Sequence, residues 1–234
     1  MLACKIGLIT YHHPHLKTEQ VMNSLLLRGY DLEVFALPFI PRASRGVRFE
    51  HRPRQSFAVM AADISVHFGV PYHLCGSDSD IGAHCDLYLV LGAGILSPAC
   101  VRGKKILNCH PGVIPSSRGL DSFKWALYEM KPLGVTLHYI DENVDAGEIV
   151  AVVPTPVYSS DTLETLARRH YENEIRILSD FEYFMANPFN AFPDAQIGRA
   201  RKRMPLSKEG ELSALISGYI AKYGGALLGR RAPG

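Results

Sequence analysis

Three residues whose side chains can together transfer an acyl group to an amine occur in a short ordered series. Asn108 and His110 lie in the run Asn-Cys-His-Pro-Gly over 108–112, and Asp145 opens the run Asp-Ala-Gly-Glu-Ile over 145–149. When a neutral amine attacks a carbonyl, charge develops on both oxygen and nitrogen. Asn108 and a protonated His110 are suited to stabilise the oxyanion, to which each well-placed donor contributes on the order of 3 kcal/mol. Asp145 is suited to orient His110 and to accept the amine proton, directly or through water.

The series contains no obvious covalent nucleophile, which favours direct transfer. Cys109 lies between the two catalytic candidates, but in an extended segment its side chain faces the opposite side. Each piece alone also fits a structural role. An Asn-x-His at a strand end is commonly a turn residue and a satisfied histidine, Asp followed closely by Gly suits a tight turn, and His138 fits the interior of a strand. Only the ordered set favours catalysis over these structural alternatives.

Two further motifs accompany the first and last runs. Arg-Gly occurs at 118–119, and Gly-Val-Thr-Leu-His occurs over 134–138. In this order and spacing the four motifs resemble the folate-dependent formyltransferase family, which includes glycinamide ribonucleotide, methionyl-tRNA and nucleotide-linked amino-sugar formyltransferases. The resemblance is densest over 86–153 and thin elsewhere.

The resemblance implies an activity, a formyl donor and a set of site residues. It makes Asn108, His110 and Asp145 the catalytic triad, supported by Thr136 and His138, with N10-formyltetrahydrofolate as the donor and no metal. Segment 92–96 belongs to the pterin pocket by resemblance, and its two glycines allow a flat ligand to approach the backbone; alone, it also fits a tight strand-to-helix turn. The cofactor-binding residues implied are Leu91, Gly92, Ala93, Gly94, Ile95, Leu96, Asp141, Val144 and Gly147.

The acceptor amine is inferred by elimination together with this resemblance. The first loop, Tyr-His-His-Pro-His over 11–15, lacks the glycine-rich phosphate cradle of glycinamide ribonucleotide formyltransferases. Residues 189–234 are too short for the C-terminal barrel of the tRNA enzymes, so we expect neither that barrel nor the regulatory domain of formyltetrahydrofolate hydrolases. Segment 118–125 most resembles the amino-sugar enzymes. We therefore expect a nucleotide-linked amino sugar, with substrate contacts among Tyr11, His12, His13, Arg118, Gly119 and Lys124.

Alternatives to this interpretation stay open. The histidines of the first loop are equally consistent with an exposed loop, and Arg118 and Lys124 with surface charges. The rival functions are a glycinamide ribonucleotide-type transferase acting on another small amine, a hydrolase in which water replaces the amine, and, most remotely, a non-catalytic folate-binding protein.

Composition places the chain among globular enzymes with one substantial core. Of 234 residues, 47% are hydrophobic and 21% are charged. A formal charge of +2 does not favour nucleic acid as a partner, and the basic cluster over 199–203 is interpreted as a solvated turn. Five cysteines without CxxC spacing suggest neither disulfides nor a zinc site. With no apolar run long enough to span a membrane, we expect a cytoplasmic protein. A homodimer is compatible with this sequence.

Short apolar strands alternate with helices, which predicts an α/β fold with a Rossmann-like, open, mostly parallel sheet, flanking helices and a short C-terminal appendage. The expected domains are a catalytic domain over 1–188 and an extension over 189–234 that contains a helix. A helix over 121–130 begins at Asp121 as its cap and places Trp125 in the core. The other predicted elements are strands over 4–10, 31–37, 69–74, 87–91, 105–107, 134–140 and 148–153, and helices over 19–27, 56–68, 162–185 and, with Ser207 as its cap, 206–223.

Overall fold

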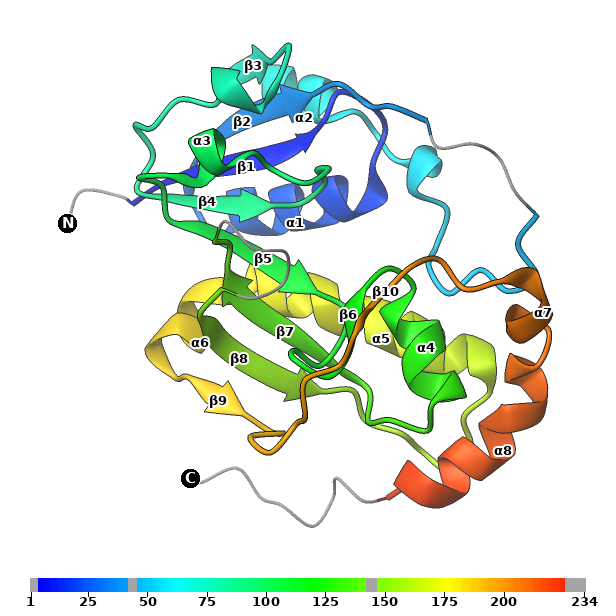
Figure 1. The fold of residues 1–234 in the computed structure, drawn as a ribbon. Helices are drawn as coiled ribbons and strands as arrows, with labels where there is room; N and C mark the ends of the chain where they lie inside the picture. The colour runs from blue at the N-terminus through cyan, green and yellow to red at the C-terminus, as the bar shows by residue number, and fades with distance from the viewer. Residues whose placement is uncertain (1–3, 42–45, 142–146, 226–234) are drawn as a thin grey trace.

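The fold is organised around an eight-stranded sheet with the order β3-β2-β1-β4-β5-β7-β8-β9. The computed structural model describes residues 4–41, 46–141 and 147–225 (Figure 1). The first five strands in this order are parallel, whereas β7 runs antiparallel to both β5 and β8. The predicted mostly parallel, Rossmann-like sheet is therefore confirmed. The strands are β1 (Lys5–Tyr11), β2 (Asp31–Leu37), β3 (Tyr72–Leu74), β4 (Leu87–Val90), β5 (Ile106–His110), β7 (Gly134–Tyr139), β8 (Ile149–Pro154) and β9 (Phe189–Asn190).

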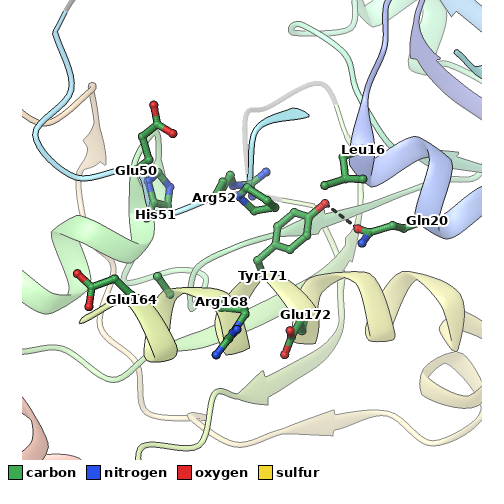
Figure 2. A pocket seen from close by; sticks show the side chains of 11 residues that line it. Leu16, Gln20, Glu50, His51, Arg52, Glu164, Arg168, Tyr171 and Glu172 are labelled. Carbon is green, nitrogen blue, oxygen red and sulfur yellow. Dashed lines mark hydrogen bonds between the residues drawn. The ribbon is translucent and has the colours of Figure 1, made fainter. Parts of the chain in front are cut away.

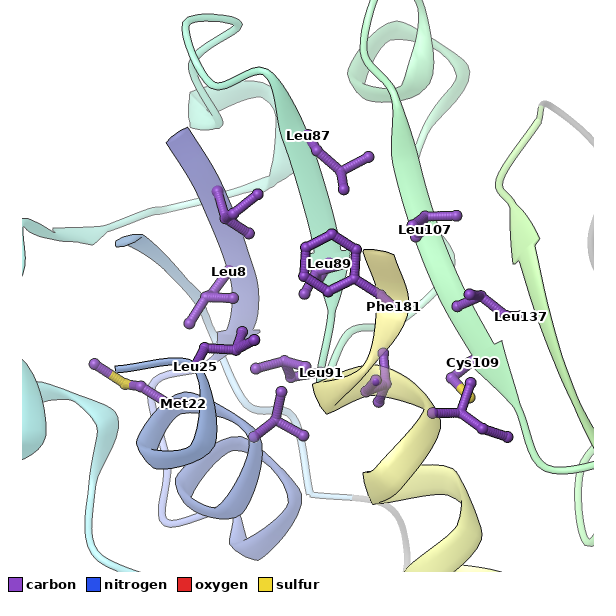
Figure 3. Packing of buried hydrophobic residues seen from close by; sticks show 14 of the residues in the cluster. Leu8, Met22, Leu25, Leu87, Leu89, Leu91, Leu107, Cys109, Leu137 and Phe181 are labelled. Atoms are coloured by element: carbon purple, nitrogen blue, oxygen red, sulfur yellow. The ribbon is translucent and has the colours of Figure 1, made fainter. Parts of the chain in front are cut away.

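Helices cover both faces of this sheet. Because successive side chains of a strand point to opposite faces, Leu87 and Leu89 enter one apolar cluster while Tyr88 and Val90 enter another. The first cluster, which Figure 3 shows, packs against α1, α5 and α6, and the second packs against α3. The helices are α1 (Leu16–Leu27), α2 (Ala61–Phe68), α3 (Pro98–Val101), α4 (Ser122–Tyr128), α5 (Leu163–Ser179), α6 (Phe181–Ala186), α7 (Leu206–Glu209) and α8 (Leu212–Tyr223).

The C-terminal segment packs against α4 and the strand that precedes it. Strand β10 (Ala200–Arg201) pairs in parallel with β6 (Arg118–Gly119), and α8 shares an apolar cluster with α4. The indole of Trp125 donates to the carbonyl of Lys202 at 2.8 Å, and this side chain is buried, as predicted. Figure 1 shows α7 and α8 beside α4, at the side of the molecule remote from β3.

Two predicted helices have bounds that differ from the observed ones. The helix predicted over 56–68 is regular only from Ala61, because the amide of Val59 donates instead to the carboxylate of Glu19. The helix predicted over 162–185 divides at Asp180, where Arg28 donates to the carbonyl of Ser179 and to the Asp180 carboxylate. A side chain inserted into the ladder of backbone hydrogen bonds ends a helix in this way.

Two predicted helix caps are also wrong in detail. Asp121 does precede α4, but its carboxylate accepts from the amide of Met204 rather than capping the helix. The helix predicted over 206–223 is two helices, and α7 begins after Pro205, not at Ser207. Within the described ranges, no helix has the length and apolar character needed to cross a membrane.

Candidate active site

The antiparallel pairing of β5 and β7 brings together two of the sequence motifs. Asn108 lies opposite His138, and His110 lies opposite Thr136. Both β5 residues stand near the carboxyl end of the parallel strands, where ligands of open α/β sheets gather. Of the five β5 residues, Asn108 alone is partly exposed. The geometry therefore presents one amide at the surface and encloses the groups around it.

His138 fixes the orientation of the Asn108 amide. Its Nδ1 lies 3.0 Å from the carbonyl oxygen of Tyr139, which can only accept, so Nδ1 carries the hydrogen. The other ring nitrogen, Nε2, then accepts from Nδ2 of Asn108 at 3.1 Å. Since an amide nitrogen has two hydrogens, Asn108 keeps a second N–H for another acceptor.

His110 is held by the segment that follows it. Its Nε2 lies 2.8 Å from the carbonyl oxygen of Ser117 and 3.1 Å from Oγ of Ser122. The carbonyl assigns the hydrogen to Nε2. Gly112 makes this arrangement possible, because a Cβ there would lie 2.7 Å from the Ser117 oxygen and 2.8 Å from Nε2 of His110. The glycine of the Asn-x-His-Pro-Gly motif is thus required by the packing of its own histidine.

Thr136 supports the same loop from the neighbouring strand. Its hydroxyl donates to the carbonyl of Gly112 at 2.7 Å and accepts from the amide of Ile114 at 3.1 Å. Behind the loop, Nε2 of the buried His170 contacts the carbonyl oxygen of Pro111 at 3.2 Å. Burial lowers the pKa of His170 to about 4, so this imidazole is neutral near pH 7. The loop after β5 is therefore bonded on both sides.

Cys109 faces away from this site, as its position in the strand predicted. Its side chain is buried in the apolar cluster that packs on α1 and α5 (Figure 3). Burial raises the pKa of its thiol far above the ordinary value, with the negative charge of Glu174 adding to the effect. A thiol of this kind is protonated at neutral pH and is a poor nucleophile.

The implied pterin segment lies beside the first loop. A Cβ at Gly92 would lie 2.8 Å from the ring of Tyr11 and 3.0 Å from that of His15. Around Gly94 a Cβ would meet nothing within 4 Å, and the side chain of Ile95 is 83% exposed. An accessible apolar side chain beside an uncrowded glycine fits a flat, partly apolar ligand.

Other implied cofactor contacts divide into those that are accessible and those that are not. The side chains of Leu91 and Leu96 are buried in the two apolar clusters, so a ligand can reach only their backbone. Asp141 is exposed, and Gly147 packs so closely on the carbonyl of Tyr139 that a Cβ has no room. Val144 and the predicted catalytic Asp145 lie outside the described residues.

The first loop carries a pocket at the end of β1. Residues of the loop line a cavity of about 250 Å³ together with Phe39, Gln55 and Ser56. Tyr11, His13 and His15 belong to this lining, whereas His12 contacts the hydroxyl of Tyr72 at 2.8 Å. Burial lowers the pKa of His15 to about 4, so this imidazole is neutral at pH 7.

Lys124 requires a correction. The sequence left it as a phosphate contact or a surface charge, but its side chain is 3% exposed and its Nζ lies 2.8 Å from Oε1 of Glu209. A buried ammonium that is already paired with a carboxylate is neither a phosphate contact nor a surface charge. Arg118 and Gly119 lie in β6 beside β10, and the turn predicted over 199–203 supplies that partner strand.

A second cavity, of about 350 Å³, lies between α1, the 50–53 segment and α5 (Figure 2). The hydroxyl of Tyr171 donates to Gln20 across it. Nearby, the buried Glu174 is paired with Lys17 at 2.8 Å and Arg52 at 2.6 Å. Burial alone would raise the pKa of Glu174, but these two positive charges outweigh it and lower the pKa to about 2. No residue predicted for the site lines this cavity.

Sequence reasoning missed the groups that hold His110. Ser117 acts through its backbone carbonyl and Ser122 through its hydroxyl, and neither function has a residue-type signature. The only available signal was position, because both serines lie close to the Asn-x-His motif and flank Arg118 and Gly119.

Comparison with known proteins gives one family. Residues 86–181 match the family model described as formyl transferase. The phosphoribosylglycinamide formyltransferase of Bacillus subtilis is 38% identical over 73 residues, which cover 31% of this chain and 37% of that protein. The similarity thus spans little more than a third of that relative's length.

Solved structures extend the likeness over most of the chain. A 4-N formyltransferase from Francisella tularensis has a TM-score of 0.60 at 16% identity, covering 90% of this chain and 86% of its own. The formyltransferase PseJ from Anoxybacillus kamchatkensis, in complex with UDP-4,6-dideoxy-4-formamido-L-AltNAc and tetrahydrofolate, has a TM-score of 0.56 at 21% identity, covering 94% and 98%. At these identities the likeness shows a shared fold.

The motif-bearing strands of this chain lie within the segment that matches the formyl transferase family model. Residues 86–181 form the formyl transferase domain, and the resemblance to the folate-dependent formyltransferase family is confirmed.

Proposed function

We propose that this protein transfers a formyl group from N10-formyltetrahydrofolate to the amine of a nucleotide-linked amino sugar. The observation that carries the proposal is the fixed and partly exposed amide of Asn108, held by His138 within the matched formyl transferase domain. Chemistry of this kind needs a preorganised donor where oxygen becomes negative, and Asn108 has one N–H left to supply it.

Asn108 and His110 divide the work in this proposal. Asn108 donates to the developing oxyanion. The Nε2–H of His110 is engaged by the Ser117 carbonyl, so Nδ1 is the ring nitrogen that exchanges a proton. Asp145 accepts the amine proton, directly or through water. The amine attacks the formyl carbon directly, because the one thiol in the motif, that of Cys109, faces the core.

The formyl donor fits the segment after β4. In this proposal the backbone of 92–94 and the exposed side chain of Ile95 contact the pterin, and Asp141 and Gly147 contribute further contacts. When bound, N10-formyltetrahydrofolate supplies an activated formyl group. The protein supplies orientation and hydrogen-bond donors.

The acceptor occupies the pocket at the end of β1. Tyr11 and His13 line this pocket, and Tyr11 also packs on Gly92, so the acceptor and the donor segments adjoin. The bound sugar nucleotide of the PseJ structure supports a nucleotide-linked amine as the acceptor class. Residues 1–188 form the catalytic domain in this proposal, and β10, within the extension over 189–234, braces the loop that holds His110.

A second candidate acceptor is glycinamide ribonucleotide. The Bacillus subtilis relative, with 38% identity over its aligned residues, favours it. The first loop of this chain opposes it, since Tyr-His-His-Pro-His offers no glycine-rich cradle for a phosphate.

The experiment that tests the proposal measures tetrahydrofolate release from N10-formyltetrahydrofolate with no amine, with glycinamide ribonucleotide, and with a panel of nucleotide-linked 3-amino and 4-amino deoxysugars. Mass spectrometry follows each acceptor. The expected result is one added formyl group on a nucleotide sugar. Transfer only to glycinamide ribonucleotide would select the second candidate, and release without an amine would select a hydrolase.

A further inference from the structure

Away from the site described above, two imidazoles and a thiol surround one buried carboxylate. Glu33 on β2 is 3% exposed, and its Oε1 lies 2.5 Å from Nε2 of His73 and 2.8 Å from Nε2 of His84. Its Oε2 lies 3.8 Å from Sγ of Cys85. The ligand atoms of Glu33, His84 and Cys85 all lie within 4.8 Å of one another.

The fold holds Cys85 over the sheet by specific contacts. A Cβ at Gly7 on β1 would lie 3.3 Å from Sγ of Cys85 and would overlap the ring of Tyr88, so only glycine admits both. The hydroxyl of Tyr88 donates to the carbonyl of Gly82 at 2.5 Å and accepts from the amide of Cys85 at 3.1 Å. The segment that carries His84 and Cys85 is therefore anchored before any ligand binds.

We propose that Glu33, His84 and Cys85, with His73 as the fourth ligand, bind one divalent transition-metal ion of the Zn²⁺ type. Zinc takes sulfur, imidazole nitrogen and carboxylate oxygen in tetrahedral sites with bonds of about 2.0–2.3 Å. Four donors at such bond lengths lie about 3.3–3.8 Å apart. Nε2 of His84 and Sγ of Cys85, at 2.8 and 3.8 Å from the carboxylate, reach this spacing by small side-chain shifts.

Lys5 supplies the competing arrangement. Its Nζ lies 2.5 Å from Oε2 of Glu33, and its side chain is 33% exposed. Without a metal the cluster is an ion-pair network in which Lys5 neutralises the carboxylate. The flexible four-carbon stem lets the ammonium move into solvent when an ion takes its place. The two arrangements make different predictions for variants of Cys85 and Lys5.

The location of the cluster gives the ion a structural role. Lys5 opens β1, and His84 and Cys85 precede β4, so the cluster lies toward the amino ends of the parallel strands. Asn108 and His110 lie toward the carboxyl ends. The ion fastens the three-residue strand β3 and the segment before β4 to the middle of β2. The proposal replaces the expectation of no zinc site, which considered only ligands close together in sequence.

The test uses the full chain stripped with a chelator and titrated with Zn²⁺ against a chromophoric competitor, and separately with Co²⁺. We expect one tight equivalent of Zn²⁺, and a Co²⁺ complex with a thiolate-to-metal charge-transfer band. Cys85→Ser removes the band and weakens Zn²⁺ binding about 100-fold or more. His84→Ala has a similar effect on affinity, and Lys5→Met tightens binding because it removes the competing cation.

Matched controls are Cys4→Ser, which removes an exposed thiol, and His67→Ala, which removes an exposed imidazole on α2. Both should keep the wild-type affinity and band. Circular dichroism in the presence of chelator checks that each variant folds. Absence of a tight equivalent in the wild type, persistence of the band in Cys85→Ser, or its loss in Cys4→Ser would each overturn the proposal.

Discussion

The candidate site and the scaffold around it solve the problem of buried polar groups in different ways. At the site, the described contacts of Asn108 and His110 include an imidazole, a backbone carbonyl and a hydroxyl, all of them neutral. In the scaffold, full charges are buried in pairs, as in Lys124 with Glu209 and Lys17 with Glu174. Neutral partners orient a group without fixing its charge, whereas buried pairs join distant segments.

Folding stability and catalytic activity therefore depend on different parts of the molecule. Substitutions in the buried ion pairs should lower the free energy of unfolding. Substitutions in the candidate site should lower the turnover number. Predictions of both kinds follow from the contacts already described.

The largest expected effect is a loss of stability in the scaffold. Glu209→Gln leaves the enclosed Lys124 without its carboxylate, which typically costs about 3–5 kcal/mol of unfolding free energy. Urea denaturation measures it. The matched control is Glu50→Gln. Oε2 of Glu50 lies 3.9 Å from Nε of Arg54, and both side chains are exposed. An exposed ion pair of this kind contributes about 1 kcal/mol or less. Similar losses in the two variants would remove the distinction between buried and exposed pairs.

The next largest effect is a loss of activity at the candidate site, with the stability of the scaffold unchanged. Asn108→Ala should lower the turnover number by about 10²–10³, because it removes a donor that acts on the transition state. Binding of tetrahydrofolate and the urea midpoint should change little. A steady-state assay that follows formylation of the free amine of the acceptor measures the turnover number. Calorimetry measures tetrahydrofolate binding, and urea denaturation measures the midpoint. Loss of turnover that merely parallels loss of folding would contradict the separation.

An intermediate effect concerns His170, which lies between the two regions. Its pKa is about 4 when folded and rises to the ordinary value on unfolding, so the unfolded state binds more protons between about pH 4 and 6.5. Stability should therefore fall as the pH drops through this window. His170→Gln should reduce that slope by about one proton per molecule, as measured by urea denaturation at a series of pH values. His67→Gln controls for the loss of a histidine, and an unchanged slope in His170→Gln would refute the assignment.

The smallest effect sharpens the description of the site. Ser122→Ala removes one of the two groups that contact Nε2 of His110, while the Ser117 carbonyl remains. We expect turnover to fall by about tenfold or less, with KM unchanged, since one neutral hydrogen bond contributes about 1 kcal/mol. A loss as large as that of Asn108→Ala would mean that Ser122 contacts the reacting groups itself.

The sequence revealed the two regions unequally. Asn108 and His110 form a short motif on a predicted strand, and the alternation of that strand placed Cys109 correctly on the opposite face. The two strands were predicted separately, but their antiparallel pairing, and with it the contact between Asn108 and His138, was not. Local patterns therefore predicted the residue types of the site and the class of fold.

Partners far apart in the sequence escaped prediction. Lys124 and Glu209 are 85 residues apart, and Lys17 and Glu174 are 157 apart, so no local pattern relates them. Lys124 consequently looked like a phosphate contact. The break of the predicted long helix at Asp180 has the same origin, because Arg28 reaches it from 152 residues away.

The most direct test of the account is a single-turnover measurement of formyl transfer by wild type and by His110→Ala, each saturated with N10-formyltetrahydrofolate and mixed with the accepted nucleotide sugar. The account predicts that His110→Ala binds the folate with wild-type affinity and stays folded under the assay conditions, although loss of the buried imidazole lowers its urea midpoint, yet transfers the formyl group at least about 10²-fold more slowly. Transfer at the wild-type rate would contradict the assignment of Asn108 and His110 as the site of the reaction.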